Sequence, residues 1–195
     1  MNDLLGLLLF AFAGSVSPGP NNAVLWASGL RFGFRRTVPH VLGTAIGIGA
    51  LVMGVALGIG ALLERFPALE VILKVVGSVY LLVIAFLVAG SGAVGRTSVS
   101  RPLSVWQGVL FQCVNPKAWV FAVAAAGTFL PSGIHRPVGL AAVAGVLMLV
   151  VVGSSSIWAM GGAALASVIE DEHRRRLLNG VVALLLVASV ALLWI

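Results

Sequence analysis

Two prolines separated by a single glycine interrupt an apolar run that is long enough to cross a lipid bilayer. The run extends from about residue 4 to residue 30, and Ser17 to Asn22 in its middle read Ser-Pro-Gly-Pro-Asn-Asn. Each proline removes a backbone donor and clashes with the preceding helical turn, and we expect Gly19 to let the chain bend between them. The sequence therefore predicts two half-helices that meet near the middle of the membrane, with Asn21 and Asn22 in the first turn of the second one.

A second long apolar run, from residue 103 to residue 130, is interrupted by Asn115, Pro116 and Lys117. Proline is well suited to the first turn of a helix, where its missing N–H would be unpaired anyway. Irregular backbone at membrane depth is tolerated only where it is buried in protein or lines a cavity, and broken helices form the substrate sites of many secondary transporters. The two interruptions, one in each half of the chain, therefore predict a transport site at the breaks.

The composition is that of an integral membrane protein with one domain over residues 1–195. Hydrophobic residues make up 60% of the chain and charged residues 9%, whereas about 25% of the residues are charged in a typical soluble domain. No polar stretch is long enough for a separate soluble domain. The net charge of +6 comes from arginines that flank the apolar runs, so it indicates membrane topology and not nucleic-acid binding.

A helix needs about 20 apolar residues to cross the hydrocarbon core, and six such runs are present. They cover residues 4–30, 38–62, 69–90, 103–130, 137–166 and 177–195. Trp194 near the end of the last run is a candidate interfacial anchor. Eight arginines follow the first, third and fifth runs. The positive-inside rule places these arginines in the cytoplasm, so both termini are expected on the outer side of the membrane.

The two halves are expected to be inverted repeats, because three spans per half reverse the orientation of the second half. Repeat one covers about residues 1–90 and repeat two about residues 103–195. Pro20 and Pro116 are 96 residues apart, which supports this division. The predicted fold is thus all-α, with six transmembrane helices in two inverted three-helix repeats and with proline-broken helices 1 and 4.

Glycines at four-residue spacing in the second span allow another helix to approach closely. They are Gly43 with Gly47 and Gly54 with Gly58. We favour packing inside the monomer as the use of this face, and a homodimer is the alternative.

The predicted membrane interior contains no carboxylate. No acidic residue occurs between Asp3 and Glu64 or between Glu70 and Glu170, so neither a carboxylate proton relay nor a carboxylate site for sodium is expected. The sequence places Lys117 near the midplane, where a charge is costly. We therefore expect Lys117 to hold a substrate carboxylate or to exchange a proton. The alternative is that its side chain snorkels to an interface.

The asparagines at the two breaks either satisfy freed backbone groups or bind substrate, and the sequence does not separate these roles. Exposed N–H groups at the start of a half-helix also attract anions such as a carboxylate. Other polar residues lie in or near the spans, and for each of them a structural role is an equal or better explanation. The predicted translocation residues are Pro18, Gly19, Pro20, Asn21, Asn22, Asn115, Pro116 and Lys117, and the weaker candidates are Tyr80, Ser155, Trp158 and Asn179.

The sequence carries no motif of an enzyme or of a metal site. A nucleophile elbow, a P-loop and an HExxH helix are all absent. His40, His135 and His173 lie at span ends without the spacing of metal ligands, and no cysteine lies near them. We therefore expect a protein without catalytic residues, bound metal or cofactor.

Residues 17–22, residues 74–81 and Phe111 with residues 115–118 resemble the sequence signatures of the first, third and fourth spans of the LysE/RhtB amino-acid exporters. The match runs over most of the chain, and its details are most similar to the cysteine/O-acetylserine exporter branch. One departure is Ile48, because many members carry a polar or acidic residue at this position. This departure argues against a strongly cationic substrate such as lysine.

The resemblance implies efflux of amino acids or close derivatives, driven by the proton motive force, from a bacterial inner membrane. It also implies that residues 18–22 and 115–117 form the translocation core. The predicted function is therefore secondary export of small neutral or zwitterionic amino acids of the cysteine, O-acetylserine and threonine type. The expected partners are this substrate and the lipid bilayer.

Two other functions are weighed against export. A passive small-solute channel is one alternative, because a sequence does not show coupling, and uphill transport that collapses with a protonophore separates the two. A membrane thiol–disulfide electron carrier is less favoured, because it requires a pair of cysteines and Cys113 is the only cysteine in the chain.

Overall fold

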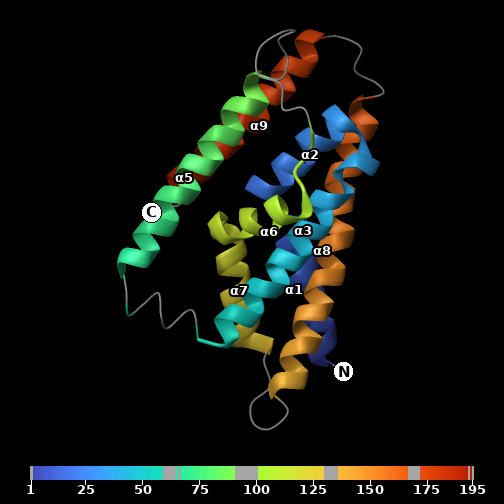
Figure 1. The fold of residues 1–195 in the computed structure, drawn as a ribbon. Helices are drawn as coiled ribbons and strands as arrows, with labels where there is room; N and C mark the ends of the chain where they lie inside the picture. The colour runs from blue at the N-terminus through green and yellow to red at the C-terminus, as the bar shows by residue number, and fades with distance from the viewer. Residues whose placement is uncertain are drawn as a thin grey trace.

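The computed structural model describes residues 2–58, 65, 67–90, 101–129, 136–166, 172–192 and 194 (Figure 1). The helices are α1 Asn2–Val16, α2 Pro20–Phe32, α3 Phe34–Ala56, α5 Pro67–Ala89, α6 Val105–Val114, α7 Pro116–Phe129, α8 Arg136–Ala166 and α9 Glu172–Leu192. No strand occurs in these ranges. The all-helical prediction is therefore confirmed for the described part of the chain.

Both predicted breaks are present. The axes of α1 and α2 are bent by 62° across residues 17–19, and those of α6 and α7 are bent by 78° at Asn115. Pro20 and Pro116 are each the first residue of a new half-helix, where an N–H would have no partner in the helix. Each interrupted apolar run is thus a pair of half-helices, as the prolines predict.

The described helices provide up to five candidate membrane spans, whereas the sequence predicts six. Three helices, α3, α5 and α8, are long and apolar enough to cross a bilayer, and each bent pair also qualifies as one broken span. The apolar part of α9, Arg176–Ala191, is shorter than a full span. The arrangement of six spans in two inverted repeats therefore stays a prediction.

Trp194, the predicted interfacial anchor, makes a hydrogen bond within the protein. Its indole Nε1 donates to Ser78 Oγ at 2.9 Å, and Ser78 lies in the middle of α5, which runs from Pro67 to Ala89. The indole N–H needs a partner when the ring packs against protein. A hydrogen bond within the protein thus positions this side chain.

Large apolar side chains remain exposed on the outside of the helices. Phe86 of α5, Val120 of α7 and Leu149 of α8 have exposed fractions of 68%, 71% and 75%. Extensive exposed apolar surface marks contact with lipid or protein. Together with the apolar helices, this surface is that of a multi-pass membrane protein.

The helices form one larger bundle with a helix pair beside it. α1, α2, α3, α6, α7 and α8 pack around one another, whereas α5 and α9 pack on each other and reach the bundle mainly through α2 and α6 (Figure 1). One buried apolar cluster joins α1, α3, α7 and α8, and a second joins α2, α5, α6 and α9. Because each bent pair contributes one half-helix to each cluster, the breaks lie between two apolar cores.

Close contact at Gly43 confirms that the glycine face of α3 packs inside the monomer. A Cβ on Gly43 would overlap the α6 backbone at Val105, and a Cβ on Gly47 would lie 2.7 Å from Gln112 Cγ. Gly58, by contrast, has a positive φ of 102° and open space around its Cβ position. The Gly43–Gly47 pair is therefore explained without a second copy of the chain.

The described helix ends that flank the arginine-rich connections lie at one end of the molecule. The junction of α2 and α3, the end of α5, the end of α8 and the start of α9 are all at the end drawn at the top of Figure 1. Arg31 and Arg36 near the junction of α2 and α3 are exposed, and so is Arg101, which precedes α6. Arg96 and His135 lie outside the described residues. The positions of these helix ends thus agree with the predicted topology, in which the arginine-rich connections share one side of the membrane.

Candidate functional site

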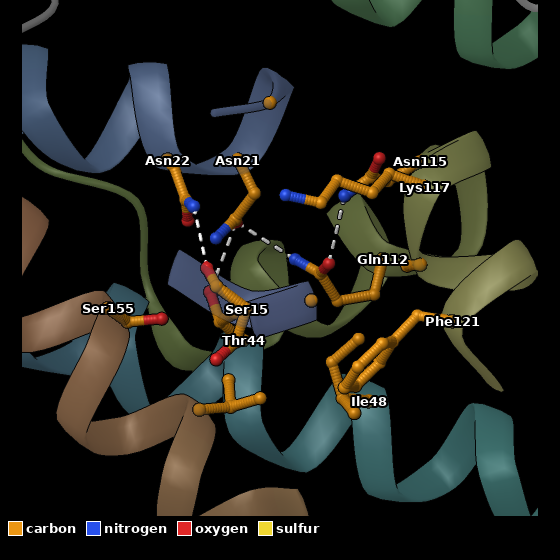
Figure 2. A pocket seen from close by; sticks show the side chains of 14 residues that line it. Ser15, Asn21, Asn22, Thr44, Ile48, Gln112, Asn115, Lys117, Phe121 and Ser155 are labelled. Carbon is orange, nitrogen blue, oxygen red and sulfur yellow. Dashed lines mark hydrogen bonds between the residues drawn. The ribbon is translucent and has the colours of Figure 1, made fainter. Parts of the chain in front are cut away.

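A small polar cavity lies where the two broken spans face each other (Figure 2). It measures about 40 Å³, which is room for about three water molecules. Helices α3 and α8 complete its walls, and none of its described lining residues is acidic. The polar residues that line it are Ser15, Asn21, Asn22, Thr44, Gln112, Asn115, Lys117 and Ser155.

Asn21 is the centre of a buried hydrogen-bond network. Its Oδ1 atom accepts a hydrogen bond from Gln112 Nε2 at 2.9 Å (Figure 2). Thr44 Oγ1 and His40 Nε2 lie 3.1 and 3.3 Å from the same oxygen. His40, which was predicted at a span end, is fully buried and lies in the second turn of α3. Buried polar groups need partners, and the oxygen of Asn21 supplies one for His40.

Gln112 connects this network to the second break. Its Oε1 atom accepts a hydrogen bond from Asn115 Nδ2 at 3.2 Å. The other side-chain atom of this amide, Asn115 Oδ1, is buried and accepts no hydrogen bond from the described residues. A buried acceptor without a donor costs about 1–3 kcal/mol. Asn115 Oδ1 is therefore a polar group that a ligand or a water molecule can satisfy.

The carbonyl groups at the end of α1 are satisfied by side chains from other helices. A helix leaves its last four carbonyls without partners in the helix itself. Asn22 Nδ2 donates to Ser15 O at 2.8 Å and to Ser17 O at 2.9 Å. Trp158 Nε1 of α8 donates to Val16 O at 3.1 Å. Of the two roles that the sequence leaves open, Asn22 thus performs the structural one in this conformation.

Lys117 reaches from the second break to the first. Its Nζ atom donates to Ser17 O at 2.5 Å and to Pro18 O at 3.3 Å, so the cation meets the negative end of the α1 dipole. The expectation that Gly19 supplies the bend is wrong, because its φ of 178° is extended backbone that any residue adopts. Its missing side chain matters instead, since a Cβ on Gly19 would lie 2.8 Å from Lys117 Cδ.

The structure brings most of the predicted residues together. Those that line the cavity are Gly19, Asn21, Asn22, Asn115, Lys117 and the weaker candidate Ser155. Pro18 lies in the first break, and Pro20 and Pro116 begin the half-helices. Tyr80, Trp158 and Asn179 do not line this cavity; they lie in α5, α8 and α9. The predicted set thus separates into residues around the cavity, prolines that shape the breaks, and three residues elsewhere.

Sequence reasoning missed several residues of the site. His40, Thr44 and Ile48 are spaced four apart in α3, and the last two line the cavity. Gln112 lies in α6, three residues before Asn115 at the second break. A helical face with polar residues at four-residue spacing was the available signal. Ile48, the departure from the family pattern, forms part of the cavity wall.

Comparison with known proteins finds relatives over most of the chain. The family described as LysE type translocator matches residues 12–194. A cysteine/O-acetylserine efflux protein of Klebsiella pneumoniae is 26% identical over 155 residues, which cover 78% of each chain. Proteins of the same name from Salmonella choleraesuis and Escherichia coli are each 30% identical, over 116 residues (60% of each chain) and 149 residues (75% of each chain). No solved structure matches the chain significantly.

Proposed function

Because this chain belongs to the LysE-type translocator family, we propose that it exports small neutral or zwitterionic amino acids or their derivatives across a bacterial inner membrane. The family match indicates a transporter and not an enzyme. The observation that carries the proposal is the polar cavity at the two breaks, whose described lining contains no carboxylate. The relatives named for cysteine and O-acetylserine efflux support substrates of that size and charge, with threonine as a further candidate.

The polar groups of the cavity match the two charges of an amino acid. Lys117 lines the cavity, and the three donors of its ammonium exceed the two carbonyls that it contacts. It therefore has capacity for a substrate carboxylate. Asn115 Oδ1, which has no described donor, is placed to accept from the substrate ammonium. A second cation, as in lysine, would find no carboxylate in the described lining and would meet the apolar Ile48.

The cavity must widen before an amino acid can bind, because it has room for about three water molecules. We propose that the two halves rock against each other to open it, as in transporters built from repeats. The pairing of α3 with α8 and of α5 with α9 supports this proposal. Each of these pairs joins the helices at corresponding positions of the two proposed repeats.

We further propose that the proton motive force drives export and that both termini face the outside. The collection of the described arginine-rich junctions at one end of the molecule supports this orientation through the positive-inside rule. A reporter fused after Ile195 is expected to be active only in its extracytoplasmic form. Activity of a cytoplasmic reporter at this position would contradict the orientation.

Efflux from preloaded cells tests the function. Cells are loaded with labelled cysteine, O-acetylserine, threonine, leucine or lysine, and efflux is followed with and without a protonophore against cells that lack the protein. We expect protonophore-sensitive efflux of at least one neutral member and little efflux of lysine. Efflux that persists with the protonophore would favour a passive channel, and preferred lysine efflux would contradict the substrate class. No efflux of any of them, in an inserted protein, would refute amino-acid export.

A further inference from the structure

A larger cavity lies between α2, α5 and the start of α6. It measures about 410 Å³, which falls within the range of small-molecule sites. Its polar lining residues are Ser28, Arg31, Tyr80, Arg101 and Gln107, and no acidic residue is among the described ones. The cavity lies at the arginine-rich end of the molecule, which the proposed orientation places in the cytoplasm.

One face of α2 connects the two cavities. Asn21 lines the polar cavity, whereas Ser28 and Arg31 line the larger one. Val24 lies between them in the same stripe, because steps of three and four residues keep to one face of a helix. Val24 is buried and borders the larger cavity. A polar path along α2 is therefore interrupted by one apolar side chain.

Along α6 and the break that follows it, an apolar residue again separates the polar residues of the two cavities. Gln107 lines the larger cavity, Asn115 lines the polar cavity, and Phe111 lies four residues from each of them. The Phe111 side chain is fully buried. Its ring centroid is 5.5 Å from that of Tyr80, which lines the larger cavity, and 6.3 Å from that of His40 in the Asn21 network. The Phe111 ring lines neither cavity, but it packs against both Tyr80 of the larger cavity and His40 of the Asn21 network.

We propose that the larger cavity is the vestibule through which the substrate enters from the cytoplasm, and that Phe111 with Val24 is the gate between this vestibule and the polar site. The proposal rests on the export function proposed above. Arg31 and Arg101 line the vestibule and give it a positive potential that attracts the carboxylate of an amino acid. An apolar barrier stops a zwitterion, because desolvating charged groups without partners is costly. The gate therefore blocks the substrate until the Phe111 ring moves.

The test measures water access and needs no transport substrate, so its failure is distinguishable from failure of the proposed function. The native thiol is removed as Cys113→Ser, and single cysteines are introduced as Gln107→Cys in the vestibule, where the side chain is exposed, or Thr44→Cys in the polar site, where it is buried. A membrane-impermeant, charged methanethiosulfonate is applied to inside-out and right-side-out vesicles. We expect Gln107→Cys to react rapidly from the cytoplasmic side and Thr44→Cys to react slowly from that side.

Opening the gate is expected to expose the polar site. Adding Phe111→Ala should raise the cytoplasmic reaction rate of Thr44→Cys by about tenfold or more, because losing a buried ring costs the closed state more than the ~1.4 kcal/mol that a factor of ten requires. Leu186→Ala is the matched control. Leu186 is fully buried in the same apolar cluster as Phe111 and borders neither cavity.

Val24→Ala is a second gate variant for the case in which Phe111→Ala does not insert. Equal Thr44→Cys rates in the gate and control variants would overturn the gate. If Gln107→Cys does not react from the cytoplasmic side, as in a crevice filled by lipid, the vestibule is overturned. A reaction from the outer side alone would overturn it as well.

Discussion

The substitution Lys117→Met tests the contact that joins the two breaks. It keeps an unbranched apolar side chain that is one atom shorter, and it removes the charge with its donors. The hydrogen bond to Ser17 O is part-buried, and the bond to Pro18 O is exposed, so we count only the first. A hydrogen bond to a charged group contributes about 1.5–3 kcal/mol. Asn22 still donates to Ser17 O in the variant, which places the expected loss near 1.5–2 kcal/mol.

This loss is measured as a change in thermal stability. For a chain of this size 1 kcal/mol shifts the Tm by about 2–4 °C, so the Tm of the purified protein, followed by tryptophan fluorescence, should fall by roughly 3–8 °C. Lys74→Met is the matched control, because Lys74 is the only other lysine and lies in α5, away from the polar cavity. Its Tm should change less than that of Lys117→Met.

Export assays on the same variants separate the structural role of Lys117 from its role in binding. We expect Lys117→Met to lose export at matched levels of inserted protein and Lys117→Arg, which keeps the charge, to retain more of the stability. A Tm of Lys117→Met within about 1 °C of the parent would refute the claim that this bond stabilises the first break. Unchanged export by Lys117→Met would refute its assignment to the substrate carboxylate.

Two further substitutions test the packing and the network of the site. Gly43→Ala should lower the Tm by several degrees, because its Cβ would overlap the Val105 backbone. Gly145→Ala is the control and should not lower the Tm, because its Cβ would meet no described atom within 4 Å. Equal Tm changes of the two variants in a fluorescence melt would contradict the close contact of α3 and α6. Gln112→Leu removes the hydrogen bonds that link Asn21 at the first break to Asn115 at the second. It should lower the free energy of unfolding, measured by denaturant titration, by about 1–3 kcal/mol. A decrease of less than about 0.5 kcal/mol in this free energy would show that the network is not stabilising.

The positions of the breaks could be predicted because proline acts on its own backbone. Pro20 and Pro116 start new half-helices whatever surrounds them, since the missing N–H and the ring clash are local. The same locality placed Asn21 and Asn22 in the first turn of α2. The expectation that the backbone freedom of Gly19 makes the bend was wrong for a complementary reason. The extended φ of Gly19 is open to any residue, and what Gly19 supplies is space for the Lys117 side chain, which is far away in the sequence.

The partners of the site residues could not be predicted, because they are chosen by packing between distant segments. Lys117 donates to a carbonyl 100 residues earlier in the chain, and Gln112 donates to Asn21 across 91 residues. Residue types alone were consistent with either a substrate or a backbone carbonyl as the partner of Lys117. The burial of His40 has the same origin, since the network with Asn21 exists only when α2 and α3 meet.

The contacts at the end of α1 suggest how occupancy of the site is linked to movement of the protein. Asn22 holds the Ser17 carbonyl from the same proposed repeat, whereas Lys117 and Trp158 hold α1 from the other one. The proposed rocking of the repeats would therefore break the bonds from Lys117 and Trp158 and would leave the bond from Asn22 intact. A substrate carboxylate that accepts from the remaining donor of the Lys117 ammonium would draw this cation away from Ser17 O, so we propose that binding weakens one of the bonds that hold the two halves together. In this view Lys117 both recognises the substrate and releases the closed conformation, while Asn22 keeps the broken end of α1 satisfied throughout.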